Sequence, residues 1–150
     1  MSEINVDLED IECVFLDLDG TIYLGTDLIP GAIEFLGRCE ARGIQRFFLS
    51  NNSSRSVQEY VTKLQQMGIA ASDDEVLLST HDLVAWLHSS NYERICLVGT
   101  EGMRNMLVAE GLIIDDEEPE LVVLGYDTEI NYGKITTATK HLHRGVSLVA

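Results

Sequence analysis

Segments with the pattern of β-strands alternate with segments that have the pattern of amphipathic helices along the whole chain. The strand-like runs are short and apolar, and they fall at residues 13–16, 44–49, 94–98 and 121–124. Between them, apolar residues recur at intervals of three and four, the spacing of a helix with one buried face. This alternation predicts βαβ units and parallel sheets, so we expect an α/β fold.

Local capping patterns indicate where several helices begin. Ser56 and Glu59 have the spacing of a capping box. Asn131 has the residue type of an N-cap and stands before a helix expected to run to residue 144. Further helices are expected at about 82–88 and 101–110. Because the run 13–16 is apolar throughout, we expect this strand to be buried on both faces.

The chain carries a large excess of acidic residues. Twenty-five Asp and Glu against ten Lys and Arg give a formal charge of −15 at pH 7. This charge repels nucleic acids and anionic lipids, so we expect neither nucleic acid nor a membrane as a partner. An anionic substrate would need a local cation beside it, which points to a metal ion.

The cysteines indicate a reducing environment. Cys13, Cys39 and Cys96 are odd in number and form no C-x-x-C pair, so neither a disulfide framework nor a zinc site is expected. Residues 1–10 contain four acids and no basic residue, the reverse of a secretory or mitochondrial targeting signal. We therefore expect a cytoplasmic protein.

Two carboxylates stand at the end of the first strand. Asp17 and Asp19 are separated by one residue, so strand geometry would send both side chains to the same side. Like charges placed together are unfavourable without a cation or a chemical role. Ligands bind at this end of parallel sheets, and Gly20 allows the chain to turn away. An ordinary strand-end turn is the alternative, and these residues alone do not decide between the two.

The second strand also ends in polar residues. Ser50 can donate its hydroxyl to a phosphoryl oxygen, and Asn51 follows it near the start of a helix, where anions are favoured. Ser53 and Ser54 fit the simpler role of loop and capping residues. If the two strands are neighbours, the carboxylates and the Ser50 hydroxyl should face one crevice.

This combination of groups suits phosphoryl transfer. A carboxylate can attack phosphorus to give an aspartyl-phosphate, and a second carboxyl can donate a proton to the leaving oxygen and later accept one from water. Mg²⁺ prefers hard oxygen ligands and can offset the repulsion between a carboxylate and a phosphoryl group.

Three motifs resemble those of the haloacid dehalogenase superfamily, and more narrowly its p-nitrophenylphosphatase and NagD-like branch. They read D-L-D-G-T, I-P-G-A and L-S-N-N. The resemblance covers most of the chain. It implies that Asp17 is the nucleophile, that Asp19 is the acid and base, and that both hold Mg²⁺, Asp19 through its main-chain carbonyl. It also implies that Ser50 and Asn51, with Gly20, bind phosphate or substrate.

The resemblance further implies an architecture. We expect a partial Rossmann-like core with a parallel sheet in residues 1–77, and the first part of an inserted α/β cap domain in residues 78–150. The Lys and the acidic pair that complete such sites would lie beyond residue 150. We therefore expect an N-terminal fragment, or a shortened relative, of a phosphatase, which by itself binds Mg²⁺ weakly and turns over poorly or not at all.

The leading hypothesis is a Mg²⁺-dependent phosphate-monoester hydrolase that acts on a small phosphorylated metabolite. A phospho-acceptor module without turnover and a catalytically incomplete fragment are the alternatives. The strand expected at 146–150 would have an exposed edge suited to pairing between copies, so a homo-oligomer is also an open alternative.

Several other residues are given structural roles. The four histidines lack a metal-ligand pattern and are expected at the surface or as helix caps. Trp86 and Tyr92 are expected in the core of the cap domain. No nucleotide-binding glycine motif with the required spacing is present.

Overall fold

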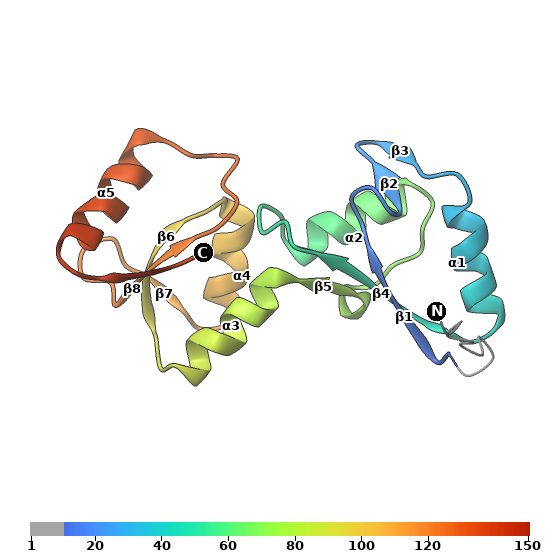
Figure 1. Cartoon of the computed structure of the whole chain (residues 1–150), viewed down its shortest axis with the longest axis horizontal. Helices are drawn as coiled ribbons and strands as arrows, with labels where there is room; N and C mark the ends of the chain where they lie inside the picture. The colour runs from blue at the N-terminus through green and yellow to red at the C-terminus, as the bar shows by residue number, and fades with distance from the viewer. Residues whose placement is uncertain (1–10) are drawn as a thin grey trace, which may run out of the picture. The chain divides into compact units, whose positions relative to one another are not determined.

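The computed structural model describes residues 11–150, so the expectation about residues 1–10 lies outside the described residues. The chain divides into two compact units (Figure 1). Unit 1 comprises the residues up to Ser50 together with 61–77, and unit 2 comprises 51–60 together with 78–150. The segment 51–60 thus belongs to unit 2, although unit 1 residues precede and follow it in sequence. The division into a core part and a cap part remains a prediction.

Unit 1 contains a three-stranded sheet with the order β1-β4-β5. Its strands are β1 (Cys13–Asp17), β4 (Gln45–Ser50) and β5 (Val76–Leu78). β1 and β4 are parallel. A short antiparallel hairpin of β2 (Tyr23–Leu24) and β3 (Asp27–Leu28) follows β1. Helix α1 (Ala32–Ala41) precedes β4 in sequence, and α2 (Val57–Gln66) follows it.

One face of this sheet is covered and the other is open. On the covered face, Phe48 is fully buried, as are Leu36 of α1 and Leu64 of α2. On the other face Phe15 is 57% exposed and stacks on Phe47 with ring centroids 5.2 Å apart. The expectation that the first strand is buried on both faces is therefore wrong for the described residues. An apolar run does not reveal which elements cover it.

Unit 2 contains a four-stranded parallel sheet with the order β7-β6-β8-β9. Its strands are β6 (Arg94–Val98), β7 (Ile113–Ile114), β8 (Leu121–Leu124) and β9 (Ser147–Val149). Its helices are α3 (Ser79–Ser89), α4 (Glu101–Ala109) and α5 (Tyr132–His143). Strands alternate with helices along the chain and pair in parallel, which confirms the predicted α/β fold.

Helices pack on both faces of the unit 2 sheet. One cluster joins Leu97 of β6 to Leu87 of α3 and Leu107 of α4. A second, smaller cluster on the opposite face joins the β6 residue Val98 to Ala138 of α5. Successive residues of β6 are buried in different clusters because side chains alternate across a strand. The core of this unit is therefore a sheet between two helical layers.

The predicted caps are present. The Glu59 carboxylate accepts a hydrogen bond from the Ser56 amide at 2.7 Å, and the Ser56 hydroxyl accepts one from the Glu59 amide at 3.3 Å. Asn131 accepts from the Lys134 amide at 3.1 Å. The capping box and the N-cap expected from the sequence are thus confirmed.

Other local predictions differ from the structure. α3 begins at Ser79, three residues before the expected start, because the ring of His81 accepts from the Leu78 amide at 3.2 Å and so extends the first turn. The short strands β2, β3, β5 and β7 were not predicted, since two or three residues carry too little periodicity to recognise.

Two aromatic side chains lie in environments other than those expected. His141 is only 4% exposed, and its Nε2 atom lies 3.0 Å from the carbonyl oxygen of Asp116, so its predicted surface or capping role is wrong. Trp86 is 43% exposed and packs beside the partly buried Tyr92, so Trp86 is not in the core. Within residues 11–150, no helix has both the length and the apolar character needed to cross a membrane.

The three cysteines are free thiols with different environments. Cys13 is exposed, whereas Cys39 and Cys96 are buried. Burial, followed by the negative charge of Asp116 and a hydrogen bond to it, raises the pKa of Cys96 to about 11. Its thiol therefore stays protonated at neutral pH and is a poor nucleophile.

Candidate active site

The main predicted site residues lie at the carboxyl ends of neighbouring strands in the unit 1 sheet. Asp17 is the last residue of β1, and Ser50 is the last residue of the parallel strand β4. Asp17 pairs with Leu49, so Ser50 lies one position further along. Strict alternation would place the Asp17 and Ser50 side chains on opposite faces, so a shared pocket would have to lie over the strand ends. Their meeting in one pocket remains a prediction.

The loop after β1 is a tight turn anchored by buried side chains. The Leu18 carbonyl accepts hydrogen bonds from the amides of Thr21, Ile22 and Tyr23 at 3.0–3.3 Å. The Gly20 amide donates to the Tyr23 carbonyl at 2.7 Å, and Gly20 has a φ of 87°, a conformation that glycine adopts without strain.

The turn leaves the carboxylates of Asp17 and Asp19 exposed, while Leu18 between them is buried. Leu18 is completely buried between the exposed Asp17 and Asp19 in sequence. The backbone of Asp19 forms a bridge with Tyr23, which is also fully buried. Burial of Leu18 and Tyr23 therefore fixes the backbone from which both carboxylates project.

The oxygen atoms of this turn suit Mg²⁺. Mg²⁺ often binds one or two carboxylates and completes its coordination with water and substrate phosphate. The Asp17 carboxylate and the Asp19 main-chain carbonyl are donors of that type. Among residues 11–150, no group of three or more His, Cys, Asp or Glu is arranged to hold a metal. The described residues therefore fit a partly hydrated Mg²⁺ ion and not a cage built from several side chains.

Lys63 is a neighbour of the turn that sequence reasoning missed. Its Nζ atom lies 3.5 Å from the centroid of the Tyr23 ring. An ammonium group over an aromatic face is attracted by the ring quadrupole. No local sequence signal could have predicted this contact, because it joins α2 to the hairpin after β1 across forty positions.

Replacement of Lys63 by Met is expected to lower the free energy of unfolding by about 0.5–2 kcal/mol, because the aliphatic side chain keeps much of the packing but loses the cation–π attraction. Lys63→Arg retains a cation and should restore most of the loss. Urea unfolding followed by circular dichroism measures both variants. Equal losses for Met and Arg would mean that packing, and not charge, matters at this position.

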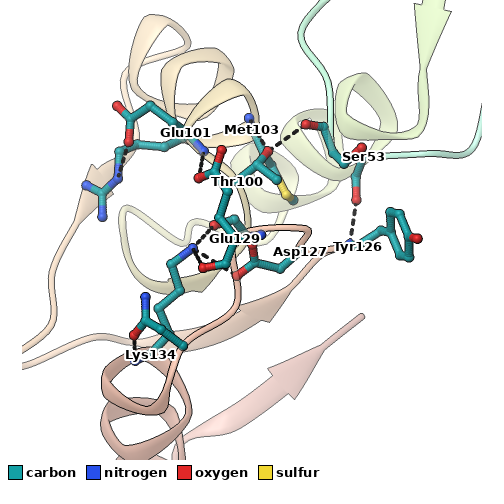
Figure 2. Close-up of polar contacts among 12 residues, drawn as sticks. Ser53, Thr100, Glu101, Met103, Tyr126, Asp127, Glu129 and Lys134 are labelled. Carbon is teal, nitrogen blue, oxygen red and sulfur yellow. Dashed lines mark hydrogen bonds and ion pairs between the residues drawn. The ribbon is translucent and has the colours of Figure 1, made fainter.

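The segment after Ser50 packs within unit 2. The Ser53 hydroxyl accepts from the Tyr126 amide at 2.8 Å, and the Thr100 hydroxyl donates to the Ser54 carbonyl at 2.8 Å (Figure 2). Ser53 and Ser54 were expected to act as loop and capping residues. Both lie in the turn between β4 and α2, as the loop role predicts, and both also contact residues distant in sequence, while Ser56 caps α2.

Unit 2 contains a cavity of about 560 Å³ beside this segment. Asn51, which is exposed and peptide-bonded to Ser50, lines it. Apolar and aromatic surface comes from Trp86, Met103 and Tyr126, and polar groups come from Ser53 and Asp82. A cavity of this size with aromatic walls and a few polar groups can accept a small organic molecule.

The chain belongs to the haloacid dehalogenase-like hydrolase family, whose sequence pattern matches residues 14–113. Its relatives place the chain in the NagD-like branch of that family, which is class IIA. A 4-nitrophenylphosphatase from Thermotoga maritima is 37% identical with a TM-score of 0.86, over 93% of this chain and 54% of that one.

Two further relatives support the same family. An acid sugar phosphatase from Staphylococcus saprophyticus is 33% identical over 147 residues, which are 95% of this chain and 56% of the relative. A glycerol phosphate phosphatase from Mycobacterium tuberculosis, solved in complex with magnesium, is 27% identical with a TM-score of 0.83, over 91% of this chain and 42% of that one. The chain thus spans about half the length of these relatives.

Proposed function

We propose that this chain carries the nucleophile and the phosphate-binding residues of a Mg²⁺-dependent phosphatase that hydrolyses a small phosphorylated metabolite. The observation that carries the proposal is the placement of Asp17 and Ser50 at the same end of neighbouring parallel strands. The family membership and the phosphatase relatives support it. A cytoplasmic location remains part of this proposal.

In the first step a carboxylate oxygen of Asp17 attacks phosphorus. The bond between phosphorus and the leaving oxygen breaks, and that oxygen takes a proton from the Asp19 carboxyl. The product is an aspartyl-phosphate on Asp17 and a free alcohol.

In the second step the Asp19 carboxylate accepts a proton from water as the water oxygen attacks phosphorus. The bond to Asp17 breaks, inorganic phosphate leaves, and Asp19 is protonated again for the next cycle. Both residues therefore return to their starting states.

The other site residues bind and orient the phosphate. The Ser50 hydroxyl, the Asn51 amide and the Gly20 backbone would contact phosphoryl oxygens. Asp17 and the Asp19 carbonyl would hold Mg²⁺, which when bound offsets the repulsion between the carboxylate and the phosphoryl group.

We further propose that the unit 2 cavity binds a small organic molecule. Trp86 and Tyr126 would pack against a ring or another apolar surface of this molecule, while Ser53 and Asp82 offer polar contacts. A sugar phosphate and an aryl phosphate both have this chemistry, in keeping with the names of the relatives.

Acetyl phosphate supplied with Mg²⁺ should phosphorylate Asp17, detected by intact-mass spectrometry and peptide mapping. The adduct should decay as Asp19 helps water to attack it. Asp19→Asn should prolong the life of the adduct by about 10²–10⁴-fold, because proton transfer is lost.

Two outcomes would oppose the phosphatase proposal. An adduct whose lifetime is long and equal in wild type and Asp19→Asn would support a phospho-acceptor module instead. Phosphorylation at residues other than Asp17 would remove the nucleophile assignment.

A further inference from the structure

Two partly buried hydrogen bonds hold the segment 51–56 against the turns of unit 2 (Figure 2). Thr100 Oγ1 donates to the Ser54 carbonyl at 2.8 Å, and the Tyr126 amide donates to Ser53 Oγ at 2.8 Å. Thr100 is 2% exposed and Ser53 is 9% exposed. Because both bonds are partly shielded from water, they favour this position of the segment.

Glycines allow the backbones to approach closely at the same contact. A Cβ atom on Gly102 would lie 2.7 Å from Glu59 Oε2 and 3.1 Å from the Ser56 amide nitrogen. A Cβ atom on Gly125 would lie 3.0 Å from Ser53 Oγ and closer still to the sulfur of Met103. The first turn of α4 and the end of β8 are thus both shaped to fit the segment 51–59.

Thr100 performs two tasks with one hydroxyl. As the N-cap of α4 it accepts a hydrogen bond from the Met103 amide at 3.3 Å. As a donor it binds the Ser54 carbonyl. A carboxylate can replace the acceptor but has no proton to donate at neutral pH, so the two tasks can be separated by substitution.

We propose that Thr100 is a positioning residue for the phosphate-binding segment that begins at Ser50 and Asn51, acting through the Ser54 carbonyl. The inference rests on the proposed function of Ser50 and Asn51. Thr100 acts through Ser54 and does not need to contact the substrate.

Three substitutions of Thr100 in the full chain test this. Thr100→Ser retains the cap and the donor, Thr100→Asp retains the cap alone, and Thr100→Val loses both. Urea unfolding reports the stability that the cap and the donated hydrogen bond supply together. Amide hydrogen exchange of residues 51–56 and Tyr126 reports the position of the segment, and titration with inorganic phosphate and Mg²⁺ reports its function.

Thr100→Ser should match wild type in all three measurements. Thr100→Asp should unfold at a lower midpoint than Thr100→Ser, because it buries a charge beside the Ser54 carbonyl. Its 51–56 amides should exchange about tenfold faster and its phosphate affinity should fall about three- to tenfold, since the Ser54 carbonyl has lost its donor. Thr100→Val should show both defects and a lower unfolding midpoint. High salt screens the added charge of Asp, so a loss of affinity that persists in salt reports positioning and not repulsion.

Wild-type exchange and wild-type affinity in Thr100→Asp would overturn the inference. Faster exchange with affinity unchanged would overturn it as well, because the segment would then move without consequence for binding. If wild type binds no phosphate, the proposed function fails; the exchange data still show whether Thr100 holds the segment, and unchanged exchange rejects that too.

Discussion

Asp17→Asn is expected to lower the rate of phosphoryl transfer on the order of a thousandfold or more, to the point where no adduct forms from acetyl phosphate. The amide oxygen of Asn is neutral and a poor nucleophile, while its size matches the carboxylate. Asp17 is exposed at the end of β1, so its replacement removes no packing. The measurement is the rate of adduct formation with Mg²⁺ present, followed by mass spectrometry.

Asp73→Asn is the matched control for this change. Asp73 is also an exposed carboxylate of unit 1, and it lies in a short 3₁₀ helix that directly precedes β5, not at the end of β1 or β4. It should phosphorylate at the wild-type rate, and both variants should unfold at the wild-type urea midpoint. Adduct formation on Asp17→Asn at an undiminished rate would place the nucleophile elsewhere.

Phe48→Ala is expected to lower the free energy of unfolding by about 3–5 kcal/mol, the largest change in stability that we predict. Phe48 is fully buried on the covered face of the unit 1 sheet, where removal of the ring leaves a cavity. The adjacent Phe47 lies on the open face, stacked on the exposed Phe15. Phe47→Ala should therefore cost only about 1–2 kcal/mol, because its ring is already partly in water.

Urea unfolding of the two variants measures this difference. If Phe48→Ala is too unstable to study, Phe48→Leu retains part of the volume and should still be more destabilised than Phe47→Ala. Equal losses at the two neighbouring positions would show that both faces of β4 are covered in solution, contrary to the exposure seen in the structure.

Features that depend on neighbours in sequence were predicted well. The capping box of Ser56 and Glu59 and the N-cap Asn131 involve residues three apart, so their geometry follows from the local pattern. The larger strands and helices follow from the period of their apolar residues. Parallel pairing of β1 and β4 follows from the intervening helix, and it brings Asp17 and Ser50 to one sheet edge.

Features that depend on distant partners could not be predicted in this way. The sequence pattern holds no sign that Lys63 lies over Tyr23, that His141 is buried against Asp116, or that Thr100 binds Ser54. The same is true of the open face of β1, since an apolar run looks the same whether one or two faces are covered.

The sequence by itself determined the α/β class and the main elements, and it singled out the candidate residues for phosphoryl transfer. These follow from side-chain periodicity and from the types of group at the strand ends. Only the tertiary structure decided that 51–60 packs within unit 2, and that Thr100 and Gly102 contact it. The physical reason is that hydrogen bonds between residues close in sequence fix the local geometry, whereas contacts between distant residues depend on how whole helices and strands pack.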